Sequence, residues 1–291
     1  WMASGTDMMT IFLGLEVMSI CLYVLAGFFR GQVRSNEAGL KYFVVGAFAS
    51  AFVVYGIALL YGLTGTLNLA DMAVRIPAVG SQHLVTGAAM LLLMAFGIKA
   101  AVFPLFYWLP ASYHTPPAPV AALFAGLLTK VGVYAIVRTQ TLLFPETNRE
   151  LLLVIAALTM VIGVLGAIAQ SDMKRILSFH IISQIGYMIM GVALGGVAAI
   201  SATIFYMLHH IPVKTSLFLV EGIVERETGS STLGRVSGLA RRSGPLAVLF
   251  LIPAFSLAGL PPFSGFLGKT AVVTEGLDQR SWWIVAAAIA V

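Results

Sequence analysis

The chain has 291 residues, of which 59% are hydrophobic and only 10% are charged, and its mean hydropathy is +0.95. Soluble domains carry about 25% charged residues, so this composition excludes a soluble globular enzyme, a disordered tail and a nucleic-acid-binding protein, although the formal net charge is +5. Because Cys21 is the only cysteine, a disulfide, a thiolate metal cluster and a cysteine-held redox centre are excluded as well.

Apolar runs of about 20 residues, the length that crosses a bilayer as a helix, recur along the chain. Runs this long lack the alternation of barrel strands, so we predict an all-α polytopic transmembrane helix bundle with about 8 complete spans plus one truncated span. No shift in composition marks a soluble domain, so residues 1–291 are predicted to form a single transmembrane domain. We expect an internal fragment, because the chain begins with Trp1 and ends inside an apolar run. The predicted spans lie at about 8–29, 40–63, 84–108, 119–144, 151–169, 176–196, 199–224, 245–268 and from 282.

Lysine and arginine are unevenly divided between the connectors on the two sides of the bundle. Cytoplasmic loops of membrane proteins are enriched in both residues, so the richer set is predicted to be cytoplasmic and Trp1 to lie on the opposite side. The mild basic excess therefore needs no anionic partner. The richer set, 30–38, 109–118, 170–175 and 225–244, holds eight such residues. The alternate set, 64–82, 145–150, 197–198 and 270–281, holds three.

The two basic residue types are also distributed differently within the spans. Of eleven arginines only Arg138 falls inside a predicted span, whereas four of the six lysines do so. A charged residue near the centre of a membrane helix costs about 2.5–3.5 kcal/mol, so the four together cost on the order of 10 kcal/mol at insertion. A lysine can lose its proton on burial whereas an arginine stays charged, so this selection indicates proton chemistry. The four lysines are Lys99, Lys130, Lys214 and Lys269.

One acidic residue, Glu16 in FLGLEVMS, lies near the middle of a predicted span. A protonated carboxyl could join two helices by hydrogen bonding, which would be a purely structural role. Alternatively, Glu16 pairs with a buried lysine, in which case moving either charge changes the proton affinity of the other. Such a pair would control proton binding as well as join two helices.

Two of the buried lysines lie beside helix breaks. Lys99 is in AFGIKAAVFPLFYWLP, where Pro104 interrupts the third span, and Lys269 is in LAGLPPFSGFLGK, where Pro261 and Pro262 interrupt the eighth. Spans an odd number apart cross the membrane in opposite directions, so this pattern predicts inverted repeats with paired broken helices and an ion site near the midplane. The two repeats would cover about 1–144 and 145–291. The alternative is a pair of packing kinks beside snorkelling lysines.

Further ionisable groups lie in the central spans. Lys130 in LLTKVGVYAIVR is mid-span, and His210 lies four residues before Lys214, on the same helix face. Imidazole can relay protons near neutral pH, although a buried histidine such as His209 can equally be a hydrogen-bonded core residue.

A polar stripe follows one face of the sixth span, and it either lines water or bonds a neighbouring helix. Lys41 and Lys174 lie near predicted span ends, where we expect their side chains to snorkel to the interface. The stripe consists of His180, Ser183, Gln184 and Tyr187.

Long stretches of this sequence resemble the antiporter-like superfamily of proton-translocating membrane subunits. From about residue 59 onward the chain resembles the D-type component of Mrp-type multisubunit cation/proton antiporters, in runs such as AFGIKAAVFPLFYWLPASYHTPPAPVAALFAGLLTKVGVYAIVRT, SDMKRILSFHIISQIGYM and FYMLHHIPVKTSLFL. The N-terminal stretch DMMTIFLGLEVMSICLYVLAGF looks more like the N-type component of the proton-pumping NADH:quinone oxidoreductase, complex I.

The resemblance implies a full subunit of about fourteen helices, of which this chain would be the fifth through the thirteenth. By the same resemblance, Glu16 matches the family's glutamate on the fifth helix and Lys99 its partner lysine on the broken seventh. Lys130 matches the central lysine of the eighth helix, and Lys269 the terminal lysine of the broken twelfth.

The resemblance also covers the eleventh helix, whose lysine and histidine match Lys214 and His210. Pro212 lies between them and departs from the family pattern, so it is expected to distort the helix near His209.

The predicted function is that of a proton-translocating membrane subunit in a multisubunit cation/proton antiporter, with Na⁺ as the candidate cation. Protons would pass along Lys99, Lys130 and Lys269 with help from Lys214 and His210, and Glu16 would set the proton affinity of Lys99. The expected partners are other membrane subunits, the transported ions and the lipid bilayer of a bacterial inner membrane. No cofactor or metal site is predicted, because the sequence holds no Walker loop, Rossmann fingerprint, HExxH or haem-ligand arrangement.

Three alternatives to this function are open on the sequence alone. The chain could belong to the membrane arm of complex I or of a membrane-bound hydrogenase, in which partner subunits hold the redox cofactors. It could also bind quinone, although no pocket of aromatic and histidine residues stands out. Lastly, it could be a scaffold whose lysines are fixed in salt bridges, which predicts that Lys99 and Lys269 each have a close acidic partner and no access to water.

Overall fold

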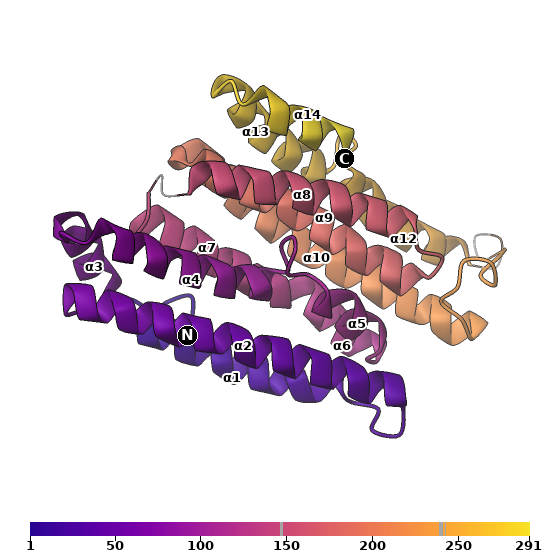
Figure 1. The fold of residues 1–291 in the computed structure, drawn as a ribbon. Coiled ribbons are helices and arrows are strands. Elements are labelled where there is room, and N and C mark those ends of the chain that lie inside the picture. Colours follow the sequence, from indigo (N-terminus) through magenta and orange to yellow (C-terminus); the bar gives the residue numbers. More distant parts are fainter. Residues whose placement is uncertain (146–147, 239–240, 242) are drawn as a thin grey trace.

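The computed structural model describes residues 1–145, 148–238, 241 and 243–291. Within these residues the regular elements are helices, accompanied by two isolated β-bridges (Figure 1). The first half contains α1 (Met8–Ala26), α2 (Val33–Thr64), α3 (Leu69–Arg75), η1 (Ile76–Ala78), α4 (Gln82–Ala100), α5 (Trp108–His114), α6 (Ala118–Leu123), η2 (Phe124–Leu128) and α7 (Thr129–Leu142). The second half contains α8 (Arg149–Ile168), α9 (Met173–Leu194), α10 (Gly196–Thr228), α12 (Gly244–Ala258), α13 (Ser264–Asp278) and α14 (Trp282–Ala290).

Seven stretches of helix in the described part of the chain are long and apolar enough to cross a membrane. They are α1, α2, α4, the continuous stretch from α6 through η2 to α7, α8, α9 and α10. The prediction of an all-α polytopic bundle is confirmed. The eighth predicted span, 245–268, is interrupted between α12 and α13, around the two prolines where the break was expected. Only its end differs, because α13 continues to Asp278.

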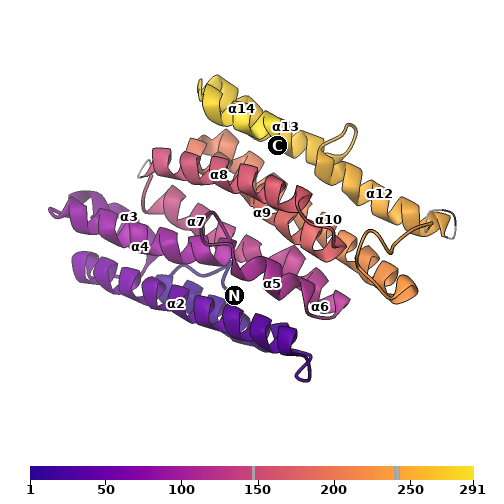
Figure 2. The ribbon, with the colours of Figure 1, turned by 45° about the vertical axis from the view of Figure 1, so that its right-hand side comes forward.

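The helices form a flat stack whose centre is α9. Figures 1 and 2 show α1, α2 and α4 along one side, α8, α9 and α10 in the middle, and α12, α13 and α14 along the other side. Most residues of α9 are buried, whereas α1 and α2 bury only one face each. The core therefore runs along α9 and the faces of α4, α7 and α10 that surround it.

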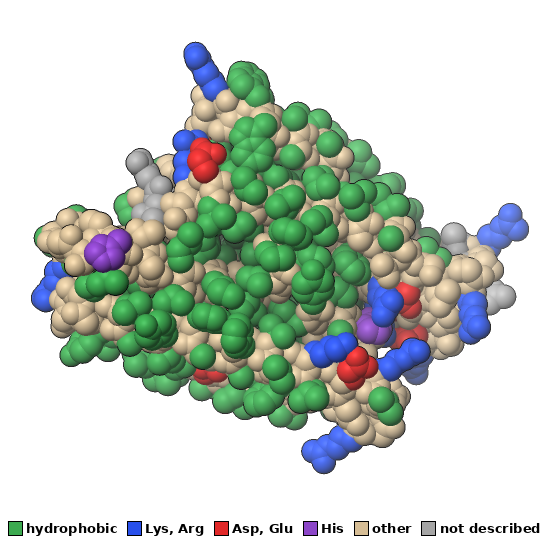
Figure 3. Space-filling model, viewed as in Figure 1, with side chains coloured by type: hydrophobic (Ala, Val, Ile, Leu, Met, Phe, Trp, Pro, Cys, Tyr) green, Lys and Arg blue, Asp and Glu red, His purple; other side chains and the backbone are tan. Residues whose placement is uncertain are grey.

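The outer surface is apolar across the middle and charged toward the ends. Figure 3 shows hydrophobic side chains over most of one face, with lysine and arginine side chains gathered toward the ends of the helices. Val24 and Phe48, for example, are more than half exposed. Large exposed apolar side chains of this kind are stable only against lipid or another apolar protein surface, so the surface fits a membrane-embedded bundle.

The two helix breaks position the candidate site. α4 stops at Ala100, Ala101 has a positive φ of 60°, and the path resumes as α5. α12 stops before Gly259, whose φ is +84°, and the path resumes as α13. Figures 1 and 2 show the α4–α5 pair and the α12–α13 pair running in opposite directions through the stack, as inverted repeats require. The assignment of the repeats to about 1–144 and 145–291 stays a prediction.

Candidate functional site

The half-buried carboxylate of α1 and the buried lysine of α4 lie in one hydrogen-bonded cluster. Lys99 Nζ is 3.5 Å from Glu16 Oε1. It also donates hydrogen bonds to Ser19 Oγ at 2.9 Å and to the Tyr23 hydroxyl at 3.0 Å. Ser50 of α2 donates to the same Glu16 oxygen at 2.6 Å. An ammonium group has three donors, so these three acceptors satisfy Lys99 as a charged group.

The break in α4 determines where Lys99 lies. Lys99 occupies the last turn of α4, where unpaired carbonyls make the helix end partially negative and favour a cation. Trp108 Nε1 of α5 donates to Ile98 O at 2.8 Å and so satisfies one carbonyl near the break. The broken helix thus places the Lys99 side chain inside the bundle, next to a helix end at which at least one carbonyl is paired.

Sequence reasoning missed the hydroxyls around this pair. Ser19 and Tyr23 follow Glu16 by three and seven residues, so they share its helix face, and that spacing was a usable signal. Ser50 comes from a different helix, and no sequence pattern placed it beside Glu16.

Lys130 lies beside a local widening of its helix. η2 is a π-helical turn, and Lys130 Nζ donates to the Ala125 carbonyl at 2.5 Å, five residues back. Single π-helical turns are frequent at functional sites, because they free backbone groups for other partners. Within the described ranges no acidic side chain pairs with this buried lysine.

The middle of α10 supplies the second central lysine and an unbonded histidine. Lys214 is fully buried, and its Nζ donates to Leu177 O of α9 at 3.2 Å. His210 is fully buried too, and neither of its ring nitrogens has a hydrogen-bond partner among the described residues. Within the described part of the chain His210 is therefore not held by hydrogen bonds, and a buried ring of this kind needs another partner, such as water, for its polar atoms.

Lys269 of α13 lies beside the second break. Its Nζ is 4.9 Å from the centre of the Tyr187 ring, and no acid pairs with it in the part of the chain that the structure describes. His209 shares a hydrogen bond of 2.8 Å with Ser264 Oγ, at the start of α13. The second broken helix is thus tied to α10 through a polar contact.

The polar stripe of α9 bonds neighbouring helices. The Tyr206 hydroxyl of α10 donates to Gln184 Oε1, and Gln184 Nε2 lies 3.3 Å from His180 Nδ1. The Tyr187 hydroxyl donates to the carbonyl of Ala288 in α14 at 2.5 Å. The stripe therefore connects α9 to α10 and to α14.

One expectation about a single residue is wrong. Lys174 does not snorkel to the interface: it is buried and its Nζ pairs with Glu225 Oε2 at 2.6 Å. Pro212 lies inside α10, which runs continuously from Gly196 to Thr228, and the expected local distortion near His209 stays a prediction. Lys41, by contrast, is exposed and pairs with Glu37 one turn away, which fits an interfacial lysine.

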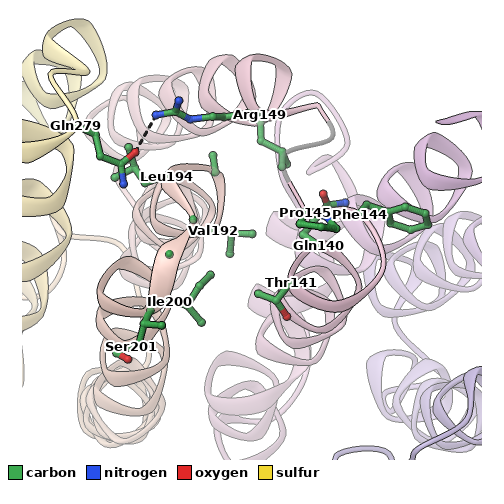
Figure 4. Close-up of a pocket in the computed structure, with 15 residues that line it drawn as sticks. Gln140, Thr141, Phe144, Pro145, Arg149, Val192, Leu194, Ile200, Ser201 and Gln279 are labelled. Atoms are coloured by element: carbon green, nitrogen blue, oxygen red, sulfur yellow. Dashed lines mark hydrogen bonds between the residues drawn. The ribbon is translucent and has the colours of Figure 1, made fainter. Parts of the chain in front are cut away.

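A separate pocket of about 840 Å³ lies at the opposite end of the bundle from the Lys174 pair. Its walls come from the end of α7, the start of α8 and the turn between α9 and α10 (Figure 4). Arg149 Nη2 donates to Gln279 Oε1 at 2.8 Å across its rim. None of the six predicted site residues lines this pocket.

The fold and the site together define a class, namely polytopic α-helical membrane proteins with paired broken helices and buried lysines. The family described as NADH:quinone oxidoreductase/Mrp antiporter, transmembrane, matches residues 5–291, and the chain belongs to that family.

The chain is similar in sequence to relatives of two kinds. The chain is 46% identical over 290 residues to the D-type component of a Na⁺/H⁺ antiporter of Alkalihalophilus pseudofirmus, covering 98% of this chain and 58% of the relative. It is 38% identical over 289 residues to the N-type component of an NADH-quinone oxidoreductase of Trichlorobacter lovleyi, covering 97% of this chain and 59% of the relative. The chain therefore spans somewhat more than half the length of these curated relatives.

The solved structure of the Mrp complex from Dietzia sp. DQ12-45-1b contains a similar chain. The two superimpose with a TM-score of 0.91 at 39% sequence identity, covering 98% of this chain and 54% of the other. The similar solved chain is thus part of a multisubunit membrane complex.

Proposed function

We propose that this chain is the proton-translocating part of a multisubunit cation/proton antiporter subunit, with Na⁺ as the exchanged cation. The observation that carries the proposal is the Glu16–Lys99 pair, an ion pair inside the bundle beside a helix break. The 46% identity to the D-type component of a Na⁺/H⁺ antiporter supports the choice of antiporter.

In this mechanism the Glu16–Lys99 pair is the switch. With the pair closed, the carboxylate stabilises the ammonium and Lys99 keeps its proton. When the pair opens, the ammonium loses its counter-charge and the proton can leave. The other candidate residues carry it onward: Lys130, His210, Lys214 and Lys269. The burial of Lys130, Lys214 and His210 inside the bundle supports this assignment, because a buried lysine can lose its proton.

The scaffold hypothesis loses its main support. It requires an acidic partner for both Lys99 and Lys269, yet within the described residues only Lys99 has one, and the partly buried Lys269 has none. The buried Lys130 and Lys214 have no acidic partner there either. Isolated buried charges are expensive, so a purely structural bundle would gain by replacing them.

A second candidate function is a proton-pumping subunit in the membrane arm of complex I. The 38% identity to the N-type component of an NADH-quinone oxidoreductase favours it. The same residues would move protons in both cases, and the difference would lie in the partner subunits. In either case the chain would sit in the inner (plasma) membrane of a bacterium, with its exposed apolar faces against lipid or other membrane subunits.

The test uses inside-out vesicles from cells that carry the full-length parent operon. Addition of Na⁺ should dissipate a preformed proton gradient in wild type and fail to do so in Lys99→Ala. The matched control is Lys41→Ala, which removes an exposed lysine of α2 and should behave as wild type. If NADH builds a gradient that Lys99→Ala abolishes while Na⁺ has no effect, the complex I function is correct. Loss of the whole protein from Lys99→Ala membranes would instead indicate a structural role.

A further inference from the structure

A second group of buried charges lies at the end of the bundle that the connector charges mark as cytoplasmic. Lys174 at the start of α9 pairs with Glu225 Oε2 at 2.6 Å and lies 3.9 Å from Glu221 Oε2. Ser231, in the connector after α10, donates to Glu221 Oε1 at 2.7 Å. We name these four residues the Lys174 cluster.

The inner carboxylate of this cluster is incompletely bonded. Glu221 is fully buried, and its Oε2 has no hydrogen-bond donor among the described residues, although the Lys174 ammonium is within ion-pair distance. Glu225 is 44% exposed at its side chain, so the outer carboxylate reaches water. The cluster thus joins an open acceptor inside the bundle to a solvent-accessible acceptor at its end.

The cluster has one more carboxylate than ammonium groups, so one of its carboxylates can take up a proton. Two carboxylates share a single ammonium, so one negative charge is uncompensated when all three groups are ionised. Asp172 and Arg175 at the start of α9 lie nearby with opposite signs, and His114 of α5 faces Lys174 and Arg175. Burial lowers the pKa of His114, so this ring is neutral at neutral pH and adds no charge.

The cluster lies in line with the central lysines. Lys214, Glu221 and Glu225 are spaced by seven and four residues on α10, so they share one face. At 1.5 Å per residue, Glu221 is about 10 Å along the helix axis from Lys214. Lys214 Nζ reaches toward that end by bonding the carbonyl of Leu177, one turn after Lys174 on α9.

We propose that Glu221, with Lys174 and Glu225, forms the proton-exchange site between the central lysines and the cytoplasm. A proton on the Lys214 ammonium passes through water to the Glu221 carboxylate, leaving a neutral amine and a carboxylic acid. It then passes to Glu225, which restores the Glu221 carboxylate, and from Glu225 to water. Lys174 keeps its own proton and stabilises whichever carboxylate is ionised. The proposal rests on the proposed function and identifies the cytoplasmic end of its proton path.

The chemistry of the cluster suits a proton better than a metal cation. The ammonium of Lys174 already occupies the space between the two carboxylates, and it repels any second cation there. In the described ranges no group of three or more His, Cys, Asp or Glu side chains could hold a metal ion. Na⁺ would therefore take a different route through the complex.

The test compares Glu221→Gln with Glu221→Asp and Glu227→Gln in the same vesicles. Glu227 lies on the same helix but is exposed and outside the cluster, so it is the matched control. A positioned proton-transfer group is worth about a hundredfold or more in rate, so Glu221→Gln should slow Na⁺-driven exchange about a hundredfold. Glu221→Asp should keep most of the rate, and Glu227→Gln all of it. The solvent deuterium isotope effect should rise in Glu221→Gln, because proton exchange becomes the slow step.

Two results would overturn the proposal: a wild-type rate in Glu221→Gln, or a slow rate with an unchanged isotope effect and less of the protein in the membrane. The second result would make the cluster a structural brace. If wild-type vesicles do not respond to Na⁺ at all, the antiporter function itself is wrong. The variants are then compared in NADH-driven proton uptake, where the same rate and isotope criteria decide on Glu221.

Discussion

The two broken helices share a backbone arrangement but hold their lysines in different electrostatic surroundings. Lys99, at the α4 break, faces Glu16 and two hydroxyl groups. Lys269, at the α12–α13 break, lies over the Tyr187 ring and has no acidic partner in the described ranges. The same backbone break can therefore hold a lysine that has an acidic partner or a lysine that has none. In the proposed mechanism only Lys99 would have to separate from a carboxylate before losing its proton, so the proposed switch belongs to the first break alone.

Replacing Glu16 should produce the largest difference between the two breaks, because within the described residues only the first break holds an acid. Glu16→Gln leaves the Lys99 ammonium without its counter-charge, and breaking a fully buried ion pair costs about 3 kcal/mol or more of stability. Glu16 is partly exposed, so we expect the full complex to lose somewhat less stability than that. If the pair is the proposed switch, Na⁺-driven proton exchange should fall about a hundredfold. Glu16→Asp should recover part of both. The control is Glu150→Gln, an exposed acid at the start of α8. Exchange at the wild-type rate in Glu16→Gln would mean that the pair is not the switch.

Removing the unpaired lysine should separate stability from transport. Lys269→Met breaks no ion pair and deletes a charge that the bundle does not balance, so the melting temperature should stay level or rise. If Lys269 carries protons as proposed, exchange should nevertheless fall at least about tenfold, since a proton-transfer group is lost. Both quantities are measured on the same purified complex, in detergent and after reconstitution. A drop in melting temperature comparable to that of Glu16→Gln would show that the two lysines are held in the same way.

Close helix crossings at the breaks provide a smaller, purely steric test. A Cβ at Gly132 of α7 would overlap the backbone of Lys99 and Ala100, and a Cβ at Gly265 of α13 would overlap the carbonyl of Ser256. Gly132→Ala and Gly265→Ala should each destabilise the complex by about 1–3 kcal/mol, as overpacking does. Gly87→Ala, on α4 in open space, is the control. Equal melting temperatures for all three variants would contradict the packing seen at both breaks.

The sequence predicted the class of fold because long apolar runs and prolines are visible in composition and spacing. The same spacing selected the six candidate residues, whose role stays a prediction. The failures of the sequence prediction have a common physical cause. Lys174 looked interfacial because its acids, Glu221 and Glu225, come from a helix some fifty residues away in the chain. The partner hydroxyl of Ser50 was missed for the same reason. Periodicity reports which residues share a face of one helix, but it does not report which faces meet.

The hydroxyl of Ser50 offers the smallest and most specific change at the first break. It donates to Glu16 at 2.6 Å, and a hydrogen bond to a charged group is worth about 1.5–3 kcal/mol when fully buried. Glu16 is partly exposed, so water replaces some of that bond and Ser50→Ala should cost about 1 kcal/mol of stability. Because Lys99 keeps all three of its acceptors, exchange should slow only a few fold, far less than in Glu16→Gln. In the double variant with Glu16→Gln, Ser50→Ala should have little further effect on exchange, since the charged acceptor is already gone. Additive losses in that double variant would mean that Ser50 acts on another group than the Glu16–Lys99 pair.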